Sequence, residues 1–282
     1  MNYRHSFHAG NHADVLKHVA VLALCDALTA KPAPVFALDS HGGRGLYRLA
    51  GQDAQRTGEA AGGIGKLRPG LDPAIERYLD AVAACRNQHG RDAYPGSPWL
   101  LAHALRADDR IAACELQAEE AAALKANFSA DPRIAIHARD GYAAIKALLP
   151  PKPGGIRLNR GLVLIDPPYE AQLAEFDAAL AALGDALQRW PQGVYALWYP
   201  IKQARALASF KRRAAALPAK SAFSIELLVR PDDSPLRMNG SGLVIWNPPW
   251  QLDAQLRPAL DALAKALGED GQGRAKLDWL KA

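Results

Sequence analysis

The chain has 282 residues, long enough to bury a full hydrophobic core in one large domain or two small ones. Hydrophobic residues make up 49% and charged residues 22%, a balance that is typical of soluble globular proteins and excludes a disordered chain. The formal charge of +5 mildly favours an anionic partner such as nucleic acid, because the excess is spread over many lysines and arginines.

The three cysteines, Cys25, Cys85 and Cys114, lie far apart and have no C-x-x-C spacing. This pattern argues against a disulfide framework or a zinc site and is typical of a reducing cytosol. The first residues contain no apolar segment like that of a signal peptide, and no apolar run approaches the length of a membrane span. The sequence therefore predicts a cytoplasmic protein that has no membrane partner.

The N-terminal segment is polar and rich in histidine, and the spacing of apolar residues then predicts a helix over residues 13–30. Asn11 or Asp14 is expected to cap it. His8 and His12 have the i, i+4 spacing of metal ligands, but no glutamate follows His8 and no cysteine lies nearby. We therefore expect no metal, and we favour contact with an anion or substrate, because imidazole, lysine and helix-start amides bind carboxylate or phosphate.

Residues 34–38 are predicted to form the first strand, which the glycine-rich stretch 39–45 follows. Glycines directly after a strand let the backbone approach a ligand closely, although such a stretch can also be only a turn. A helix should come next, but the next convincing strand is 111–116, beyond the reach of a normal crossover. We therefore interpret residues 47–94, with a helical pattern at 75–82, as an inserted helical subdomain; a long structural loop is the alternative.

Regular alternation of helices and strands resumes with Pro95-Gly96-Ser97-Pro98, which predicts a helix capped by Ser97. Glu115 stands near the end of the second strand, where an acidic residue bonds ribose hydroxyls in dinucleotide-binding folds. The third strand, 134–137, leads to Asp140 and Gly141. This order predicts an α/β fold with a mostly parallel, doubly wound sheet, formed by residues 1–46 and 95–282.

The segment Gly161–Tyr169 is the centre of this pattern. Its four branched aliphatic residues, 162–165, predict a strand that is buried on both faces in the middle of a parallel sheet. Pro167 and Pro168 end the strand, because neither offers an N–H group to a neighbour. Asp166 and Tyr169 should therefore lie at the carboxyl end of a central strand, where open α/β sheets bind their ligands.

An acid, a carbonyl and an aromatic ring in one turn suit the exocyclic amine of adenine. The carboxylate of Asp166 and the carbonyl of Pro167 can each accept one hydrogen of the amine, while Tyr169 stacks on the base. Such acceptors help most where charge develops in the transition state. The alternative is an ordinary turn between strand and loop, since Asp-Pro begins many turns.

The last third of the chain predicts a helix over 172–187, a strand over 194–199, and a basic helix whose charges either face solvent or contact nucleic acid. Two strands without a helix between them, 223–229 and 242–246, imply an antiparallel hairpin at the edge of the sheet. A helix over 252–267 and a polar tail are expected to close the chain. Asn247-Pro248-Pro249-Trp250 has the same form as the segment at Asp166, but it ends an antiparallel strand at the opposite rim, so we interpret Asn247 as a turn residue.

Two sets of residues resemble known families. Asp39-x-His41-x-Gly43-x-Gly45, acids at the ends of the next two strands, and Asp166-Pro167-Pro168-Tyr169 are together similar to class I S-adenosylmethionine-dependent amino-methyltransferases. One departure is His41, where many adenine methyltransferases carry phenylalanine. The segments Tyr3–His18, Tyr94–Pro98 and Ala196–Pro200 resemble the RlmJ family of bacterial 23S rRNA adenine-N6 methyltransferases, and this similarity extends over essentially the whole chain.

The resemblance implies a Rossmann-like class I methyltransferase fold with a small inserted helical subdomain, S-adenosylmethionine as cofactor, and adenine 2030 of 23S rRNA as target. It implies Asp166 as the catalytic acceptor and suggests that Tyr3 and its neighbours Arg4 and His5 touch the RNA. The cofactor site that it implies comprises His18, His41, Ser97, Glu115, Asp140, Gly141 and Asp166.

Reasoning from the residues agrees with these positions. Lys17 and His18 at a helix start can hold the methionine carboxylate of the cofactor, and the glycine turn that includes Gly43 lets the sulfonium approach. Glu115 can bind the ribose diol, and Asp140 can accept a hydrogen bond from the adenine amine of the cofactor. No metal is required, because the sulfonium already activates the leaving group.

The target base must be unpaired or flipped for its amine to reach Asp166. A folded ribosome would hide such a site, so we expect free or partly assembled 23S rRNA as the substrate and a monomeric enzyme. A DNA adenine methyltransferase would share Asp166 and Tyr169 and remains one alternative. The other is a non-catalytic RNA-binding assembly factor on a methyltransferase scaffold.

Overall fold

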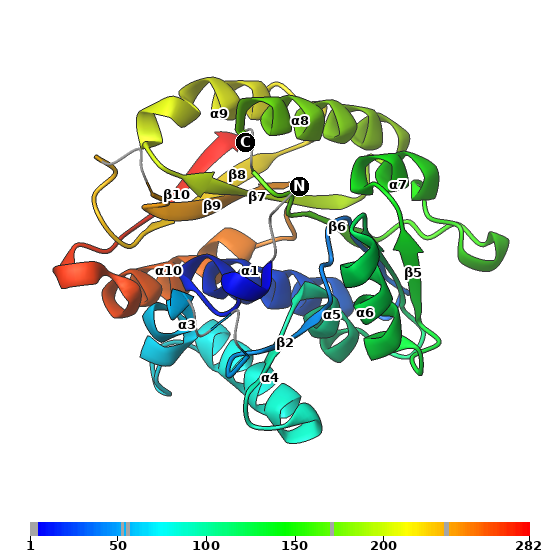
Figure 1. Ribbon diagram of the computed structural model, residues 1–282. Coiled ribbons are helices and arrows are strands. Elements are labelled where there is room, and N and C mark those ends of the chain that lie inside the picture. Colours follow the sequence, from blue (N-terminus) through cyan, green and yellow to red (C-terminus); the bar gives the residue numbers. More distant parts are fainter. Residues whose placement is uncertain (1–4, 52–53, 55–56, 170–171, 234–236) are drawn as a thin grey trace.

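The computed structural model (Figure 1) describes every residue except 1–4, 52–53, 55–56, 170–171 and 234–236. Its main feature is an eight-stranded sheet with the order β10-β8-β9-β7-β6-β1-β4-β5. The strands from β5 to β7 are parallel, and β9, β8 and β10 continue the sheet in antiparallel fashion. The strands are β1 (Phe36–Asp39), β4 (Arg110–Glu115), β5 (Ile134–Ala138), β6 (Gly161–Ile165), β7 (Val194–Ile201), β8 (Ala222–Leu228), β9 (Gly240–Trp246) and β10 (Arg274–Lys281).

Helices cover both faces of the sheet, as Figure 1 shows, so the predicted doubly wound α/β fold is confirmed. On one face lie α1 (His12–Thr29), α4 (Pro73–His89), α5 (Ser97–Ala104), α6 (Ala118–Phe128) and α10 (Leu252–Leu267). On the other lie α7 (Gly141–Leu148), α8 (Gln172–Arg189) and α9 (Ala208–Ala215). Short 3-10 helices are η1 (His5–Phe7), η2 (Ile64–Lys66), η3 (Pro153–Gly155), η4 (Ala204–Leu207) and η5 (Glu269–Gly271).

Strand β6 lies between β1 and β7, and all five of its residues are buried. Leu162 and Leu164 pack into the core beneath α1, whereas Val163 and Ile165 pack into the core beneath α8. A continuous aliphatic run suits this position, because successive side chains of a strand point alternately into the two cores, one on each face of the sheet. The strand therefore delivers Asp166 to the carboxyl edge of the sheet, next to the end of β1.

The predicted N-terminal helix and its cap are confirmed. The Asn11 side chain accepts hydrogen bonds from the backbone N–H groups of Ala13 and Asp14, at 2.9 and 3.0 Å. Apolar residues on several sides of α1 are buried, since the helix lies between the sheet, α4 and α10. This burial fixes the start of α1, where Lys17 lies, against the sheet.

The segment between β1 and α5 contains the expected helix α4 and a shorter helix, α3 (Glu59–Gly62). It also contains a feature that the sequence analysis missed. Strands β2 (Leu46–Arg48) and β3 (Ala93–Pro95) form an antiparallel ribbon that joins the two ends of the segment. The assignment of residues 47–94 to a separate subdomain stays a prediction.

The antiparallel hairpin expected in the last third of the chain is confirmed as β8–β9. Two other expectations about the fold are wrong. The expected polar tail is a strand, β10, which pairs with β8 and forms the outermost strand of the sheet. The charged side chains of β10 made this segment read as a polar tail. Such charges are common on edge strands, because they prevent pairing with other chains. Gly96, not Ser97, is the N-cap of α5, and Ser97 is its first helical residue.

Asn247 lies as expected at the end of an antiparallel strand. Trp246, the last residue of β9, is paired with Tyr195 near the start of β7, so Asn247 lies at the rim opposite Asp166. Its side chain accepts a hydrogen bond from the backbone of Lys220 and donates to the carbonyl oxygens of Pro191 and Gly193. These three hydrogen bonds stabilise the turn at Asn247.

Candidate active site

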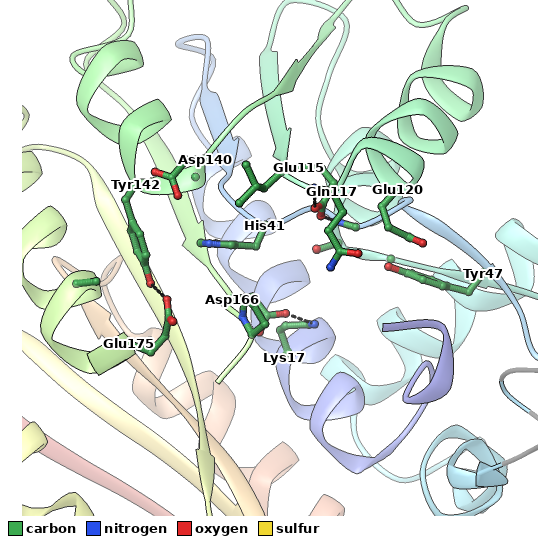
Figure 2. A pocket seen from close by; sticks show the side chains of 18 of the residues that line it. Lys17, His41, Tyr47, Glu115, Gln117, Glu120, Asp140, Tyr142, Asp166 and Glu175 are labelled. Carbon is green, nitrogen blue, oxygen red and sulfur yellow. Dashed lines mark hydrogen bonds and ion pairs between the residues drawn. The ribbon is translucent and has the colours of Figure 1, made fainter. Parts of the chain in front are cut away.

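A cavity of about 410 Å³ opens at the carboxyl ends of the parallel strands (Figure 2). The segments that follow β1, β4, β5 and β6 line it, together with the start of α1. Its volume lies in the range of small-molecule sites. The lining residues are Lys17, His41, Gly42, Gly43, Tyr47, Gly96, Ser97, Glu115, Leu116, Gln117, Glu120, Asp140, Gly141, Tyr142, Asp166, Pro168, Ala174, Glu175 and Ala178.

The glycine turn after β1 brings backbone N–H groups to the end of β4. Gly43 has a φ of +55°, and a Cβ atom there would lie 2.3 Å from the Tyr47 hydroxyl. The N–H of Gly43 donates to Oε2 of Glu115 at 3.0 Å, and the N–H of Gln117 donates to Oε1 at 2.7 Å. A side chain at residue 43 would therefore be strained and would also push Tyr47 aside.

Glu115 is the acid that ends β4, and both of its oxygens have backbone partners. Burial raises the pKa of its carboxyl, although the backbone hydrogen bonds oppose that rise. The two N–H groups orient the carboxylate at the cavity wall. Each oxygen keeps capacity for another donor, because a carboxylate oxygen has two lone pairs.

Asp140 forms the N-cap of α7, and its Oδ1 accepts a hydrogen bond from the N–H of Ala143 at 2.7 Å. The next residue, Gly141, lies so close to the end of β1 that a Cβ atom would be 2.2 Å from the carbonyl oxygen of Ser40. Glycine is therefore required for the start of α7 to reach the cavity. The helix start also adds partial positive charge to this wall.

His41 lies between Asp140 and Asp166 in Figure 2. Its Nδ1 is 2.7 Å from the Ser40 hydroxyl, and its ring makes an edge contact with Tyr142 at 5.3 Å between centroids. Burial lowers the pKa of His41 to about 4, although Asp166 and Asp140 raise it. The imidazole is therefore neutral near neutral pH and contributes a hydrogen-bonding, not a charged, surface.

Lys17 and Asp166 both line the cavity, form an ion pair and point toward each other in Figure 2. The Nζ atom of Lys17 is 2.5 Å from Oδ2 of Asp166 and 3.0 Å from Oδ1 of Asp14. The exposed fractions of the three side chains are 5%, 14% and 2%, respectively. Burial lowers the pKa of Lys17, but the two carboxylates together outweigh it and hold the pKa well above its usual value.

Asp39, the last residue of β1, is a second acid beside this pair. Burial raises its pKa to about 6, repulsion by Asp166 adds to the rise, and a hydrogen bond from Ser97 opposes it. Oδ2 of Asp39 is buried and has no hydrogen-bond partner among the described residues. A buried acceptor without a donor is costly, so this carboxyl suits a proton, in agreement with its raised pKa.

Comparison with known proteins identifies the family. The family model described as ribosomal RNA large subunit methyltransferase D, RlmJ, matches residues 32–281. The chain belongs to the RlmJ family of ribosomal RNA large subunit methyltransferases. It is therefore an rRNA methyltransferase of an S-adenosylmethionine-dependent family.

Its relatives match over their full length. The chain is 38% identical to ribosomal RNA large subunit methyltransferase J of Haemophilus influenzae over 284 residues, and 36% identical to that of Escherichia coli over 282 residues. In both comparisons 99% of each protein is covered. A crystal structure of a Legionella pneumophila protein superposes with a TM-score of 0.85 at 30% identity, covering 96% of this chain and 98% of that one. The predicted family and fold class are thus confirmed.

Most of the side chains that the sequence assigned to the cofactor site line this one cavity of the RlmJ-family fold: Lys17, His41, Gly43, Ser97, Glu115, Asp140, Gly141 and Asp166. His18 does not line it. Its ring is fully buried, with Nδ1 3.1 Å from the Tyr94 hydroxyl, which in turn lies 2.8 Å from the Tyr78 hydroxyl. His18 therefore packs behind the residues that line the cavity and does not face the cavity itself.

The turn after β6 is arranged differently from the expectation at two residues. Pro168, not Pro167, lines the cavity, and Tyr169 does not line it. The Tyr169 hydroxyl donates to the carbonyl oxygen of Trp198 at 2.6 Å, and its ring lies 5.3 Å from the ring of Phe176. The aromatic ring is therefore packed against protein, which fixes the turn after β6.

Most of the residues predicted to contact RNA lie outside the part of the chain that the structure describes. Tyr3 and Arg4 lie outside the described residues. His5 begins η1, and its side chain is also outside the described part. The following residue with a described side-chain anchor is His8, whose Nδ1 lies 3.0 Å from Glu59 on α3.

Five polar residues of the wall were not predicted: Tyr47, Gln117, Glu120, Tyr142 and Glu175. Gln117 lies two residues after Glu115 and Tyr142 directly follows Gly141, and that position beyond a strand end was a usable signal. Tyr142 donates to Glu175 at 2.6 Å, which joins α7 to α8. Tyr47 comes from the β2–β3 ribbon, and nothing in its local sequence indicated a return to the cavity.

Two further observations concern metals and membranes. Within the described part of the chain, no group of three His, Cys, Asp or Glu residues is arranged to hold a metal ion. Among the same residues, no helix is long and apolar enough to cross a membrane.

Proposed function

We propose that this chain transfers a methyl group from S-adenosylmethionine to the N6 amine of one adenine in 23S rRNA, adenine 2030 by family resemblance. The observation that carries the proposal is the position of Asp166 at the tip of β6, on the wall of the cavity and in contact with Lys17. A carboxylate there can accept a hydrogen from an amine that has no other activation.

The cavity fits the cofactor in three respects. Gly43 and Gly141 leave room that a Cβ atom would occupy. Glu115 offers oriented oxygens for a diol, and Asp140 offers an acceptor for an amine. When bound, S-adenosylmethionine supplies an electrophilic methyl group with a neutral leaving group.

The residues of this chain would bind and orient the target amine. Lys17 holds the Asp166 carboxylate in one position, and Tyr169, through its bond to Trp198, holds the turn that carries it. Pre-organised acceptors help most at the atom where positive charge develops, here the amine nitrogen during attack. Pro167 is the proposed second acceptor, through its carbonyl oxygen.

We extend the proposal to the N-terminal segment and the substrate. Tyr3, Arg4 and His5 would contact RNA, because they precede a segment that is anchored beside the site by Glu59, which binds both His8 and Asn11. The substrate would be an unpaired adenine in free 23S rRNA or in early assembly intermediates, and the enzyme a cytoplasmic monomer. Residues 47–94 would form a subdomain that supports this segment.

A mass-spectrometric map of methylated adenines in rRNA, from cells with and without this protein, tests the function. One N6-methyladenine in 23S rRNA should be lost without the protein and restored by it. An unchanged map would contradict the proposal, and methylation of DNA of the same sequence at an equal rate would favour a DNA methyltransferase. Equal rates on assembled large subunits and on protein-free 23S rRNA would contradict the proposed substrate state.

A further inference from the structure

A second hollow, of about 570 Å³, lies in the segment between β2 and β3. Its walls come from η2, α3 and α4 and from Leu49, and it shares no residue with the active-site cavity. Apolar side chains form its floor, with Leu49, Ile64, Leu79 and Val82 among them. Helices α3 and α4 pack beside α1, as Figure 1 shows.

Two arginines at this hollow lack the partners that other arginines of the segment have. Arg48 pairs with Asp92, and Arg77 with Asp26. Arg68 and Arg86 both line the hollow, and neither has a carboxylate within ion-pair distance among the described residues. Among the residues that the structure describes, these two positive charges therefore have no ion-pair partner.

Arg86 carries the more informative observation. Its Nε atom is withdrawn from solvent and has no hydrogen-bond partner in the part of the chain described. Burying a charged donor without an acceptor costs free energy, and native proteins rarely leave such groups unsatisfied without a functional reason. An anionic oxygen in the hollow would supply the missing acceptor.

Arg68 is exposed to solvent, but hydrogen bonds fix the position of its side chain. Nη1 donates to the carbonyl oxygens of Gly65 and Leu67, both at 2.7 Å, so the guanidinium is tied to the end of η2. The remaining N–H groups are available to a ligand. Guanidinium groups suit phosphate, which arginine binds through paired hydrogen bonds.

We propose that this hollow binds a nucleotide of the rRNA substrate other than the target adenine. A phosphate group would contact Arg68 and Arg86, while the ribose or base lies on the apolar floor. The proposal rests on the proposed function, which makes RNA the substrate. Leu49 of the hollow lies two residues after Tyr47 of the cavity, at most about 7 Å along the backbone, so one RNA strand can reach both sites.

The role of such a site would be to select the RNA, not to perform chemistry. A single flipped adenine carries no information about its neighbours, and contacts to the flanking backbone set register and affinity. Loss of these contacts should therefore raise KM for long RNA and leave kcat unchanged. A short substrate that contains the target adenine alone should not be affected.

The test uses the double variant Arg68→Gln/Arg86→Gln, with Arg91→Gln as matched control, because Arg91 is an exposed arginine of the same segment outside both cavities. Methyl transfer is measured with a long 23S rRNA fragment and with a short oligonucleotide. For the double variant, KM for the fragment should rise about tenfold or more, and the slope of log KM against log salt should fall by about one unit. A KM within about twofold of the Arg91→Gln value would overturn the inference.

A second measurement does not depend on the folding of a variant. Wild-type protein is crosslinked to 23S rRNA fragments that contain 4-thiouridine near the target, and the modified peptides are identified. Crosslinks on η2 or on α4 near Arg86 are expected, and their absence in the presence of crosslinks elsewhere would contradict the proposal. If wild-type protein methylates no RNA at all, the proposed function itself fails, which is a distinguishable result.

Discussion

Replacement of Lys17 by methionine tests the electrostatic arrangement of the site. Methionine keeps most of the length of the side chain and removes its ammonium group. Two carboxylates then lose their shared partner, since Lys17 lies 2.5 Å from Asp166 and 3.0 Å from Asp14. All three side chains are largely buried, so water cannot fully replace the lost contact.

The magnitude follows from the burial of the three groups. Removal of one member of a buried ion pair costs about 3–5 kcal/mol, because the partner charge is left unpaired. Asp166 is 14% exposed and recovers some hydration, so we expect the lower end, about 3 kcal/mol of unfolding free energy. In the double variant Lys17→Met/Asp14→Asn, part of this loss should be recovered, with a coupling of about 1–3 kcal/mol.

Urea denaturation of both variants near neutral pH measures these values. Lys31→Met, which removes an exposed lysine just beyond α1, is the matched control and should change the unfolding free energy by less than about 0.5 kcal/mol. Methyl transfer by Lys17→Met should also fall, because Asp166 loses its fixed orientation. Stability of Lys17→Met within about 1 kcal/mol of wild type, with additive effects in the double variant, would refute the reasoning.

Three other changes have defined outcomes. Burial raises the pKa of Asp39 from 3.8 to about 6, so the folded state loses stability as pH rises through that window. Asp39→Asn should therefore gain up to about 3 kcal/mol of unfolding free energy near pH 8 and nothing below about pH 3. Lower stability of Asp39→Asn near pH 8 would contradict this. The Nδ1–H group of His8 donates a hydrogen bond to the Glu59 carboxylate, and this contact raises the pKa of His8. The stabilisation that it gives is fully present below the ordinary pKa of 6.5 and is lost as pH rises through the raised pKa. In Glu59→Gln, NMR titration should show a lower pKa of His8, and an unchanged value would mean that the contact does not form in solution. Tyr169→Phe removes the hydrogen bond to the Trp198 carbonyl and should cost about 1 kcal/mol in urea denaturation, whereas a neutral effect would show that this bond does not hold the turn.

Local patterns were sufficient to predict the elements that carry the site. Strand β6 could be identified because a strand between two cores needs apolar residues at every position, and Asp166 marks its end without ambiguity. The cap at Asn11 also depends on nearby residues alone. In contrast, β10 alternates charged and apolar residues and needs only one partner strand, so it could not be told from a polar tail.

Contacts between distant residues could not be predicted. The sequence indicated that Lys17 lies near a helix start, but not that its partner would be Asp166, 149 residues away. Ser97 was expected to cap α5, whereas Gly96 is the N-cap and Ser97 lines the cavity. Tyr169 was assigned to the base, and the structure instead shows a ring in contact with Phe176 and Trp198, whose positions depend on tertiary packing.

The most direct test of the central claim compares methyl transfer and cofactor binding in one variant, Asp166→Ala. Alanine removes the carboxylate that is to accept the amine hydrogen and leaves no acceptor in its place. We expect the rate of methyl transfer to 23S rRNA to fall by about 100-fold or more, while calorimetry shows S-adenosylmethionine still bound. A variant that binds the cofactor and methylates at the wild-type rate would contradict the role of Asp166.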